Sequence, residues 1–300
     1  MKSKTIIIIV GPTAVGKTSL AIDIAGHFNT AIISADSRQC YRELTIGVAK
    51  PDAEQLRQIR HYFINSHSIH EDLNAALFEQ YALDAVNEIF TSRDTAVMVG
   101  GTGLYIKAFC EGLDQIPAVS PEVRESITAS YKRSGINWLQ EQLRVIDPDY
   151  IVSGEILNPQ RLMRALEVKL HTGRSIREFQ QHKKVHREFK IIKIGLELPK
   201  EELHKNIHWR VDEMMKQGMV EEARSLQSYQ SLPALRTVGY TELFSYFENK
   251  ISLKAAIDLI RKNTRQYAKR QLTWFRKDPG VQWHKPLDKQ KIIDLYQGSG

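Results

Sequence analysis

The sequence predicts an α/β fold in which a parallel sheet is flanked by helices and carries an all-helical insertion domain. Strand-like and helix-like patterns alternate in residues 1–112 and resume in residues 189–300, as in a doubly wound sheet. Residues 113–188 contain helical patterns and no convincing strand. The composition, with 42% hydrophobic and 26% charged residues in a chain of 300, is that of a globular protein with a sizeable core.

The first third of the chain supplies the clearest elements. Thr5–Val10 is a continuous β-branched run, which suits a strand buried on both faces of a parallel sheet. An amphipathic helix is expected over Lys17–Phe28. Ala31–Ser34 and Thr95–Val99 predict two further buried strands, and a helical pattern over Ala76–Phe90 precedes the second of these.

The remaining chain predicts helices and one further strand. Pro148 and Pro159 break the helical patterns of the insertion. Phe189–Leu198 restores the alternation of a strand, so we expect the chain to return to the sheet there. Helices should follow from Glu201 onward.

Charge and cysteine content narrow the functional classes. The chain has 42 Lys and Arg against 35 Asp and Glu, a net charge of +7, which is compatible with a polyanionic partner. Cys40 and Cys110 are too few for a disulfide framework or a four-ligand zinc site. No run approaches the roughly 18 apolar residues of a membrane span. We therefore expect a cytoplasmic protein with no membrane partner.

A phosphate-binding loop follows the first predicted strand. Gly11–Thr18 reads Gly-Pro-Thr-Ala-Val-Gly-Lys-Thr and fits the pattern Gly-x-x-x-x-Gly-Lys-Ser/Thr between a buried strand and an amphipathic helix. Its backbone N–H groups can surround a phosphate at the positive end of the helix, while Lys17 adds a charge and Thr18 can hold Mg²⁺. The sequence therefore predicts a P-loop NTPase-like core. The predicted diphosphate site comprises Gly11, Pro12, Thr13, Ala14, Val15, Gly16, Lys17 and Thr18.

Asp36 is the acidic residue that the P-loop alone does not explain. It follows the strand Ala31–Ser34, so it should face the same crevice as the phosphates. Asp36 could serve as a general base or as a metal ligand. The structural alternative is that it caps a turn with Ser34 and Ser37.

Several motifs, in order along the chain, resemble those of the tRNA dimethylallyltransferase family. They are Ile33–Arg42 with its continuation Ile46–Pro51, then Gly100–Tyr105, Asn158–Val168, Arg236–Tyr240 and Tyr267–Arg276. The resemblance covers about residues 5–277. One departure is Ser153–Leu157, where many family members have a basic stretch that contains His.

The resemblance implies an enzyme that transfers a dimethylallyl group from dimethylallyl diphosphate to tRNA. The acceptor would be the exocyclic N6 amine of the adenosine beside the anticodon, and diphosphate would be released. The implied fold is a P-loop core whose helical insertion grips the anticodon stem-loop, with Mg²⁺ as the ion. We expect a monomer.

The catalytic roles expected from the residues and the resemblance fall on four side chains. Lys17 and Thr18 would stabilise the leaving diphosphate, the latter as the protein ligand of Mg²⁺. Asp36 would accept a proton from the attacking amine. Thr102 resembles the family's hydroxyl that contacts the target nucleotide, and its structural alternative is a helix N-cap.

Expected tRNA contacts come from both parts of the chain. Gln160 and Arg164 lie four residues apart, on one face of a presumed helix, and by resemblance this segment contacts tRNA. The assignment of Arg124 rests on the resemblance alone. The full set is Asp36, Ser37, Arg38, Gln39, Thr102, Arg124, Gln160, Arg161, Leu162, Met163, Arg164, Arg236, Gly239, Arg265, Lys269 and Arg270.

The C-terminal region contains a basic helix. Lys254–Lys277 carries eight basic residues and a single acid, Asp258. Arg261, Arg265 and Lys269 recur every four positions and form one stripe, which suits a sugar-phosphate backbone. The alternative is a solvated helix with no RNA contact.

Some prominent residues are interpreted as structural. Met214, Met215 and Met219 are expected to fill gaps in the core, because a flexible thioether adapts to irregular spaces. Cys40 is expected to pack, since no nearby His could activate it as a nucleophile.

Three rival functions share the P-loop. A kinase or NTPase would use Asp36 as a metal ligand and bind ATP. An adenylate dimethylallyltransferase, acting on free nucleotides, would share the chemistry without needing the insertion or the basic helix. A non-catalytic RNA-binding module is disfavoured by the intact Lys17, Thr18 and Asp36.

Overall fold

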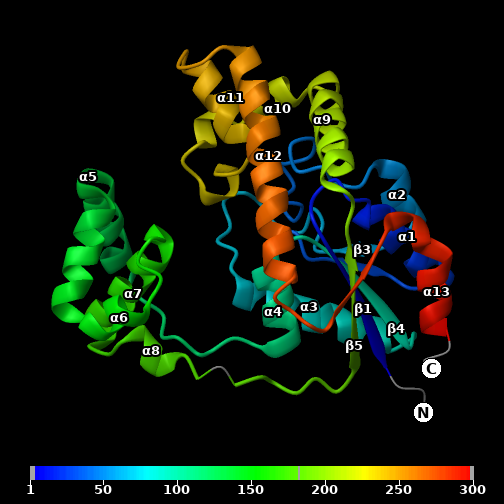
Figure 1. Ribbon diagram of the computed structural model, residues 1–300, viewed down its shortest axis with the longest axis horizontal. Helices are drawn as coiled ribbons and strands as arrows, with labels where there is room; N and C mark the ends of the chain where they lie inside the picture. Colours follow the sequence, from blue (N-terminus) through cyan, green and yellow to red (C-terminus); the bar gives the residue numbers. More distant parts are fainter. Residues whose placement is uncertain (1–3, 182, 298–300) are drawn as a thin grey trace. The chain divides into compact units, whose positions relative to one another are not determined.

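The computed structural model describes residues 4–181 and 183–297 and divides into two compact units, residues 1–110 with 186–300 and residues 111–185. The larger unit contains a six-stranded sheet in the order β3-β2-β4-β1-β5-β6, and every pair of neighbouring strands is parallel (Figure 1). The strands are β1 Thr5–Val10, β2 Ile32–Ser34, β3 His61–Tyr62, β4 Thr95–Val99, β5 Lys190–Leu196 and β6 Val281–His284. The predicted fold class is confirmed.

Helices cover both faces of this sheet. They are α1 Lys17–His27, α2 Ala53–Gln58, α3 Ala75–Phe90, α4 Gly103–Glu111, α9 Lys200–Lys216, α10 Met219–Ser225, α11 Tyr240–Phe247, α12 Leu253–Phe275 and α13 Lys289–Gln297. Short 3-10 turns lie at Gln227–Tyr229, Pro233–Leu235 and Pro286–Asp288.

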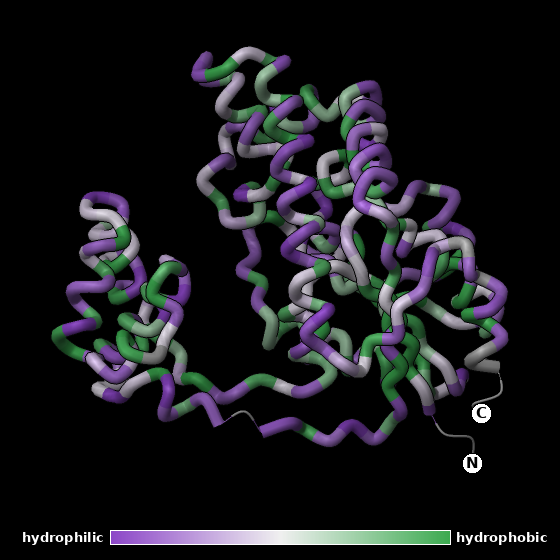
Figure 2. The backbone as a smooth tube through the Cα atoms, viewed as in Figure 1, coloured by the Kyte–Doolittle hydropathy of each residue, from purple (hydrophilic) through white to green (hydrophobic). Residues whose placement is uncertain are grey.

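Strand β1 is the centre of the fold. It pairs with β4 on one side and β5 on the other, so both of its edges are hydrogen-bonded. The side chains of Ile6, Ile8 and Val10 enter one hydrophobic cluster, and those of Ile7 and Ile9 enter a second cluster on the opposite face. This double burial explains the uninterrupted apolar run, which appears as a hydrophobic segment in Figure 2.

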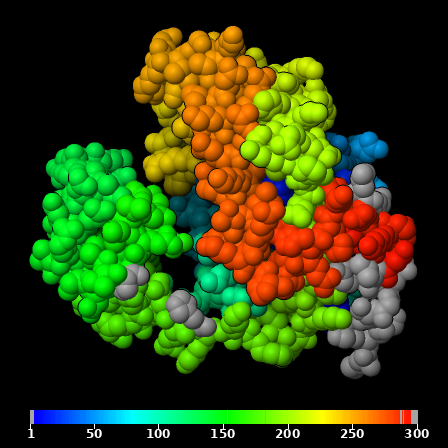
Figure 3. Space-filling model, viewed as in Figure 1, coloured from blue at the N-terminus to red at the C-terminus, as the bar shows by residue number. Residues whose placement is uncertain are grey.

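The two clusters identify which helices cover each face. Helices α1 and α13 contribute to the cluster of Ile7 and Ile9, whereas α3, α4, α10 and α11 contribute to that of Ile6 and Ile8. Helix α9 contributes to both, through Ile207 to the first and Val211 to the second. Helix α12 contributes to both clusters and also contacts α9, beside which it runs in Figure 3. Helices α9 and α12 therefore each pack into both hydrophobic layers.

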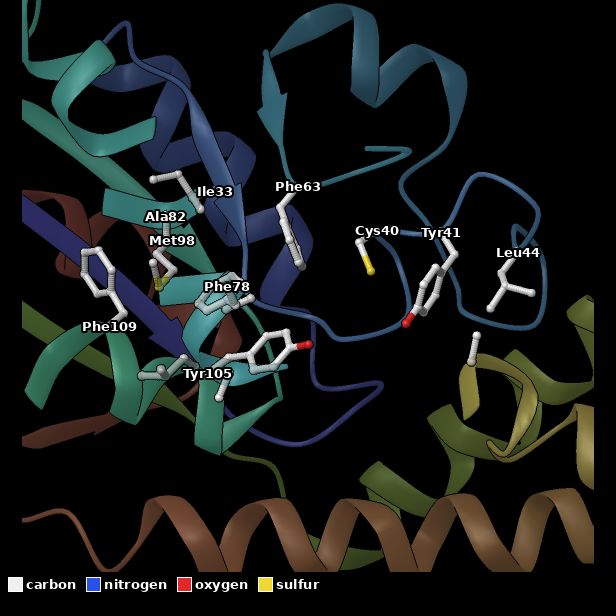
Figure 4. Packing of buried hydrophobic residues seen from close by; sticks show 14 of the residues in the cluster. Ile33, Cys40, Tyr41, Leu44, Phe63, Phe78, Ala82, Met98, Tyr105 and Phe109 are labelled. Carbon is white, nitrogen blue, oxygen red and sulfur yellow. The ribbon is translucent and has the colours of Figure 1, made fainter. Parts of the chain in front are cut away.

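Aromatic side chains fill the cluster beneath the loop that follows β2. The rings of Phe78 and Tyr105 stack at 4.4 Å between centroids, and the edge of Phe63 packs against Phe78 at 5.0 Å. Figure 4 shows these rings between the sheet and the loop that bears Cys40 and Tyr41. Cys40 is fully buried there, in the structural position that the sequence predicted.

The smaller unit contains only helices among its described residues. They are α5 Pro121–Ile146, interrupted at Gly135, α6 Pro148–Ser153, α7 Pro159–Thr172 and α8 Ile176–Phe179. Pro148 and Pro159 each occupy the first position of a helix, where a missing N–H costs nothing, and Asp147 and Asn158 cap the helices that follow. The two prolines therefore begin helices as well as separating them.

Of the helices that the structure describes, none has both the length and the apolar character needed to cross a bilayer.

The core of the smaller unit predicts the effect of truncating Leu162, whose side chain is 0% exposed. Leu162→Ala should reduce the free energy of unfolding by about 2–5 kcal/mol, because it removes buried contacts and leaves a cavity. Thermal unfolding followed by circular dichroism measures this. Leu170→Ala, on the same helix but 56% exposed, is the matched control and should leave the transition unchanged. Equal stability of the two variants would contradict the packing.

Candidate active site

The phosphate loop connects β1 to α1. Gly11 has a φ of 141° and Gly16 a φ of 99°, conformations that favour glycine, and a Cβ on Gly11 would lie 2.6 Å from the carbonyl oxygen of Leu196. The amide of Leu20 donates to the carbonyl oxygen of Gly16, so the amides before it belong to the first turn, which a helix leaves without internal partners. The loop therefore presents N–H groups and the positive helix end to an anion.

Two partly buried cations lie at this loop. Lys17 Nζ donates to the carbonyl oxygen of Pro12 at 2.7 Å, and Arg210 Nη1 donates to Thr13 Oγ1 at 3.1 Å. Burial, then the neighbouring charge of Arg210, lowers the pKa of Lys17 to about 7, although Asp36 acts in the opposite direction. Burial also lowers the pKa of Arg210. A bound anion would relieve the cost of burying both groups.

Asp36 follows β2, where it both caps a turn and lines a cavity. Its Oδ1 accepts hydrogen bonds from the amides of Arg38 at 2.8 Å and Gln39 at 3.3 Å, so one carboxylate oxygen caps a turn. The same residue lines a cavity together with Thr13 and Arg210. The turn-capping alternative is therefore realised, but it does not remove the carboxylate from the cavity.

Thr102 holds the turn after β4 against the turn after β2. Its Oγ1 accepts a hydrogen bond from the amide of Ser37 at 3.0 Å, and its own amide donates to the carbonyl oxygen of Ala35 at 3.2 Å. Helix α4 begins at the next residue. The Thr102 hydroxyl therefore bonds to the Asp36 turn, which differs from the helix-capping alternative.

Two cavities of the larger unit meet at Arg210. The first, which we call the Asp36 cavity, has a volume of about 470 Å³ and is lined by Thr13, Asp36, Arg38, Arg210, Tyr267, Arg270 and their neighbours. The second, the P-loop cavity, has a volume of about 390 Å³ and is lined by residues 14–19, Lys50, Trp209, Arg210 and their neighbours. Ala49, Arg210 and Met214 line both. An anion in one cavity and a group facing Asp36 in the other would thus be adjacent.

Distant sequence motifs build the wall shared by these cavities. Glu222 accepts hydrogen bonds from the amides of Ile46 at 2.8 Å and Gly47 at 2.9 Å, and from the hydroxyl of Tyr240 at 2.6 Å. Gln39 Nε2 donates to the carbonyl oxygen of Ala49 at 3.0 Å. The segments 46–51 and 236–240 are therefore joined through one carboxylate, although nearly two hundred residues separate them.

The predicted RNA contacts of the larger unit divide into two groups. Those that line the Asp36 cavity are Asp36, Ser37, Arg38, Arg236, Gly239 and Arg270. Those that do not are Gln39, Thr102, Arg265 and Lys269. Arg265 lies 2.8 Å from His208 Nε2 on α9, whereas Lys269 is exposed.

The predicted contacts of the smaller unit lie mainly on α7. Glu167 pairs with Arg124 at 3.5 Å and with Arg164 at 3.3 Å. Arg161 pairs with Glu155, and Gln160 is exposed.

Leu162 and Met163 require a correction. Only 0% and 7% of their surfaces are exposed, and both belong to the hydrophobic cluster of the smaller unit. Their side chains cannot reach RNA, because the inward face of α7 carries them.

The structure adds residues that sequence reasoning missed. Arg210 lines both cavities. Met214, Met215 and Met219 belong to the core or pack against it, as expected, but they also line the Asp36 cavity. No local pattern marks Arg210, which reaches the phosphate loop only through the tertiary fold. Gln271 had a signal, since it is a polar residue on the buried stripe of α12.

The fold and the phosphate loop place the chain among P-loop α/β proteins, here with a helical insertion between β4 and β5. The sequence model of the IPP transferase family matches residues 39–278, and the chain belongs to that family. The resemblance noted in the sequence motifs is confirmed.

Individual relatives cover nearly the whole chain. A tRNA dimethylallyltransferase of Christiangramia forsetii is 50% identical over 98% of this chain and 97% of its own length, and one of Cytophaga hutchinsonii is 43% identical over the same shares. A crystal structure of the full-length tRNA isopentenylpyrophosphate transferase of Bacillus halodurans aligns with a TM-score of 0.72 and 32% identity, covering 99% of this chain and 96% of that one. A eukaryotic dimethylallyltransferase acting on tRNA aligns with a TM-score of 0.75 and 26% identity, covering 91% of this chain and 70% of that one.

The lowered pKa of Lys17 predicts proton uptake on anion binding. Since this pKa is about 7, the Lys17 amine is largely neutral at pH 8, and inorganic diphosphate should bind together with a proton. Affinity should therefore weaken as the pH rises from 7 to 9. Calorimetry in buffers of different ionisation enthalpy counts the protons. Lys17→Arg is the control, because an arginine stays charged and the protonation of diphosphate is common to both proteins. Equal proton counts would contradict the assignment.

Proposed function

We propose that the chain transfers a dimethylallyl group from dimethylallyl diphosphate to the exocyclic N6 amine of the adenosine beside the anticodon of tRNA, releasing diphosphate. The observation that carries this proposal is the junction of the two cavities at Arg210, with the phosphate loop on one side and Asp36 on the other. The names of the full-length relatives support it.

On the leaving side, negative charge develops on the diphosphate as the carbon–oxygen bond breaks. The amides at the start of α1, the Lys17 ammonium and the Arg210 guanidinium would stabilise that charge without reorganising. Diphosphate raises the proton affinity of Lys17, so the residue is charged when the substrate is bound.

We also propose Mg²⁺ as the metal ion. Within residues 4–181 and 183–297, His, Cys, Asp and Glu side chains form no group of three that could hold a metal. The donor present at the phosphate loop is the hydroxyl of Thr18, which lines the P-loop cavity. A single hydroxyl suits Mg²⁺, which takes few protein ligands and completes its shell with substrate phosphates and water. The Thr18 hydroxyl would contribute the protein ligand, and the ion would neutralise charge on the leaving diphosphate.

On the attacking side, Asp36 would accept the proton that the amine loses. A carboxylate is a weak base toward a free amine, but the nitrogen becomes acidic as the new carbon–nitrogen bond forms. Thr102 accepts from the Ser37 amide, so its own proton can be donated to the nucleotide. The base and the hydroxyl would thus act from two turns that hydrogen bonds hold together.

The dimethylallyl group would lie between these two sides. Val48, Val211, Met214, Met215 and Met219 supply apolar wall to the Asp36 cavity. Thioether side chains adapt to the shape of a small branched group.

RNA would enter the Asp36 cavity as an unstacked nucleotide. An adenine must leave the loop stack to reach a buried site, which favours aromatic and arginine side chains at the mouth. Arg38, Arg236, Tyr267 and Arg270 supply them. The smaller unit would grip the stem-loop through exposed polar groups such as Gln160.

Asp36→Asn tests the proposal. The transfer rate of this variant should fall by a factor of at least about 10², which is the lower end of what general-base catalysis contributes. Its affinity for an anticodon stem-loop should stay within a few-fold of that of the unchanged protein. Labelled dimethylallyl diphosphate, Mg²⁺ and bulk tRNA, followed by nucleoside analysis, measure the transfer. Turnover like that of the unchanged protein would remove Asp36 from the mechanism.

The same assay separates the rival functions. Prenylation of AMP in preference to the stem-loop would indicate an adenylate dimethylallyltransferase. Steady ATP hydrolysis or phosphoryl transfer, with no label in RNA, would indicate a kinase or NTPase and overturn the proposal.

The exposed basic residues of α12 predict a salt effect. Neutralising Lys269 and Arg270 together, as Lys269→Gln and Arg270→Gln, should weaken stem-loop binding and reduce its salt slope by about one unit for each lost phosphate contact. Lys216→Gln, on the exposed end of α9, is the control. An unchanged slope would mean that α12 does not meet the RNA backbone.

A further inference from the structure

Gln271 connects the phosphate loop to the turn that follows β4. Its Oε1 accepts a hydrogen bond from the amide of Thr13 at 2.8 Å, and its Nε2 donates to the carbonyl oxygen of Gly101 at 3.0 Å. The residue is only 5% exposed, on the buried stripe of α12. A single amide on one helix thus bridges two loops that are 88 residues apart in the sequence.

The chemistry of the two partners requires a glutamine. A backbone N–H can only donate and a carbonyl oxygen can only accept, so the orientation of the amide is determined. A carboxylate at this position could satisfy Thr13 but would repel Gly101, and an ammonium would do the reverse. Asparagine has the two groups but is one methylene shorter.

The turn after β4 is shaped to receive α12. A Cβ on Gly101 would lie 2.0 Å from Gln271 Nε2, and one on Gly103 would lie 2.2 Å from Trp274 Cδ1. Both glycines therefore allow the helix to approach the turn closely. The same helix holds both contacts, so the turn cannot shift without breaking one of them.

The two residues that Gln271 holds lie beside the two sides of the proposed reaction. The hydroxyl of Thr13 accepts a hydrogen bond from the Arg210 guanidinium at the phosphate loop. Gly101 directly precedes Thr102, whose hydroxyl accepts a hydrogen bond from the turn that contains Asp36. Since the Thr13 amide donates to Gln271, a bound phosphate would rely on the amides that follow Thr13 in the loop. Gln271 itself does not line either of the two cavities.

We propose that Gln271 is a positioning residue that fixes the separation between the phosphate loop and the Thr102 turn. This inference rests on the proposed transfer reaction. By acting on Thr13 and Gly101, Gln271 holds the leaving diphosphate and the acceptor nucleotide in line for attack. Its loss should therefore lower kcat much more than it raises the KM for either substrate, because each half-site keeps its own binding groups.

Gln271→Glu supplies a test that a purely structural role would not pass. A protonated carboxyl has one acceptor and one donor and can replace the amide, whereas the ionised form cannot. Relative to the unchanged protein at the same pH, kcat should be within about three-fold at pH 6 and at least ten-fold lower at pH 9. This ratio cancels the titration of Lys17, Asp36 and diphosphate, which both proteins share. For Gln271→Met, which has neither the donor nor the acceptor, kcat relative to the unchanged protein should be low at every pH.

Gln266→Glu is the matched control. Gln266 is exposed on the same helix, so this variant adds the same charge without touching either loop. Its kcat ratio should be flat with pH. A flat, near-unity ratio for Gln271→Glu, or a KM increase with unchanged kcat, would overturn the positioning role.

A measurement on the unchanged protein covers the case in which the variants fail to fold. The Thr13 amide should exchange its hydrogen slowly both without and with inorganic diphosphate, because Gln271 protects it in both states. Rapid exchange without diphosphate would overturn the bridge. If the unchanged protein transfers no prenyl group, the proposed function fails, and the Thr13 exchange still decides whether Gln271 holds the loop.

Discussion

Positive charge concentrated at the start of α1, which Asp36 offsets only in part, is the constraint on which the rest of this structure depends. The Lys17 ammonium and the Arg210 guanidinium are both partly buried, and the amides of the first helical turn add to the positive potential. Burying two neighbouring positive charges without an anion is unfavourable to folding. The pKa of Lys17 is lowered for the same reasons, first by burial and then by the charge of Arg210. An anion bound at this site would offset the repulsion between these cations, and the proposed release of diphosphate would use the same charges.

Polar side chains, not long secondary structure elements, hold this site together. Glu222 accepts hydrogen bonds from backbone amides of the loop after β2. Thr102 joins the turn after β4 to the turn after β2, and Gln271 joins the turn after β4 to the phosphate loop. Each of these groups satisfies backbone N–H or C=O groups that a loop would otherwise leave for water. The loops that carry the chemistry therefore have defined positions, although they have no regular secondary structure of their own.

Local signals explain what the sequence could predict, and tertiary contacts explain what it could not. The segment from β1 through α1 is predicted within one residue at each boundary, because a doubly buried strand and the Gly-Lys-Thr motif are both local. Strands β3 and β6 escaped prediction since they lie at the edges of the sheet, where one has two residues and the other buries only Val281. Arg210 reaches Thr13 from a position 197 residues away, which no periodicity reveals.

The basic helix α12 also shows what sequence periodicity cannot predict. Periodicity correctly groups Arg261 with Arg265, but this stripe faces α9, where Arg261 pairs with Asp212 and Arg265 contacts His208. Tyr267 and Arg270 instead turn toward the Asp36 cavity. Spacing tells which residues share a face, whereas packing decides which face is free.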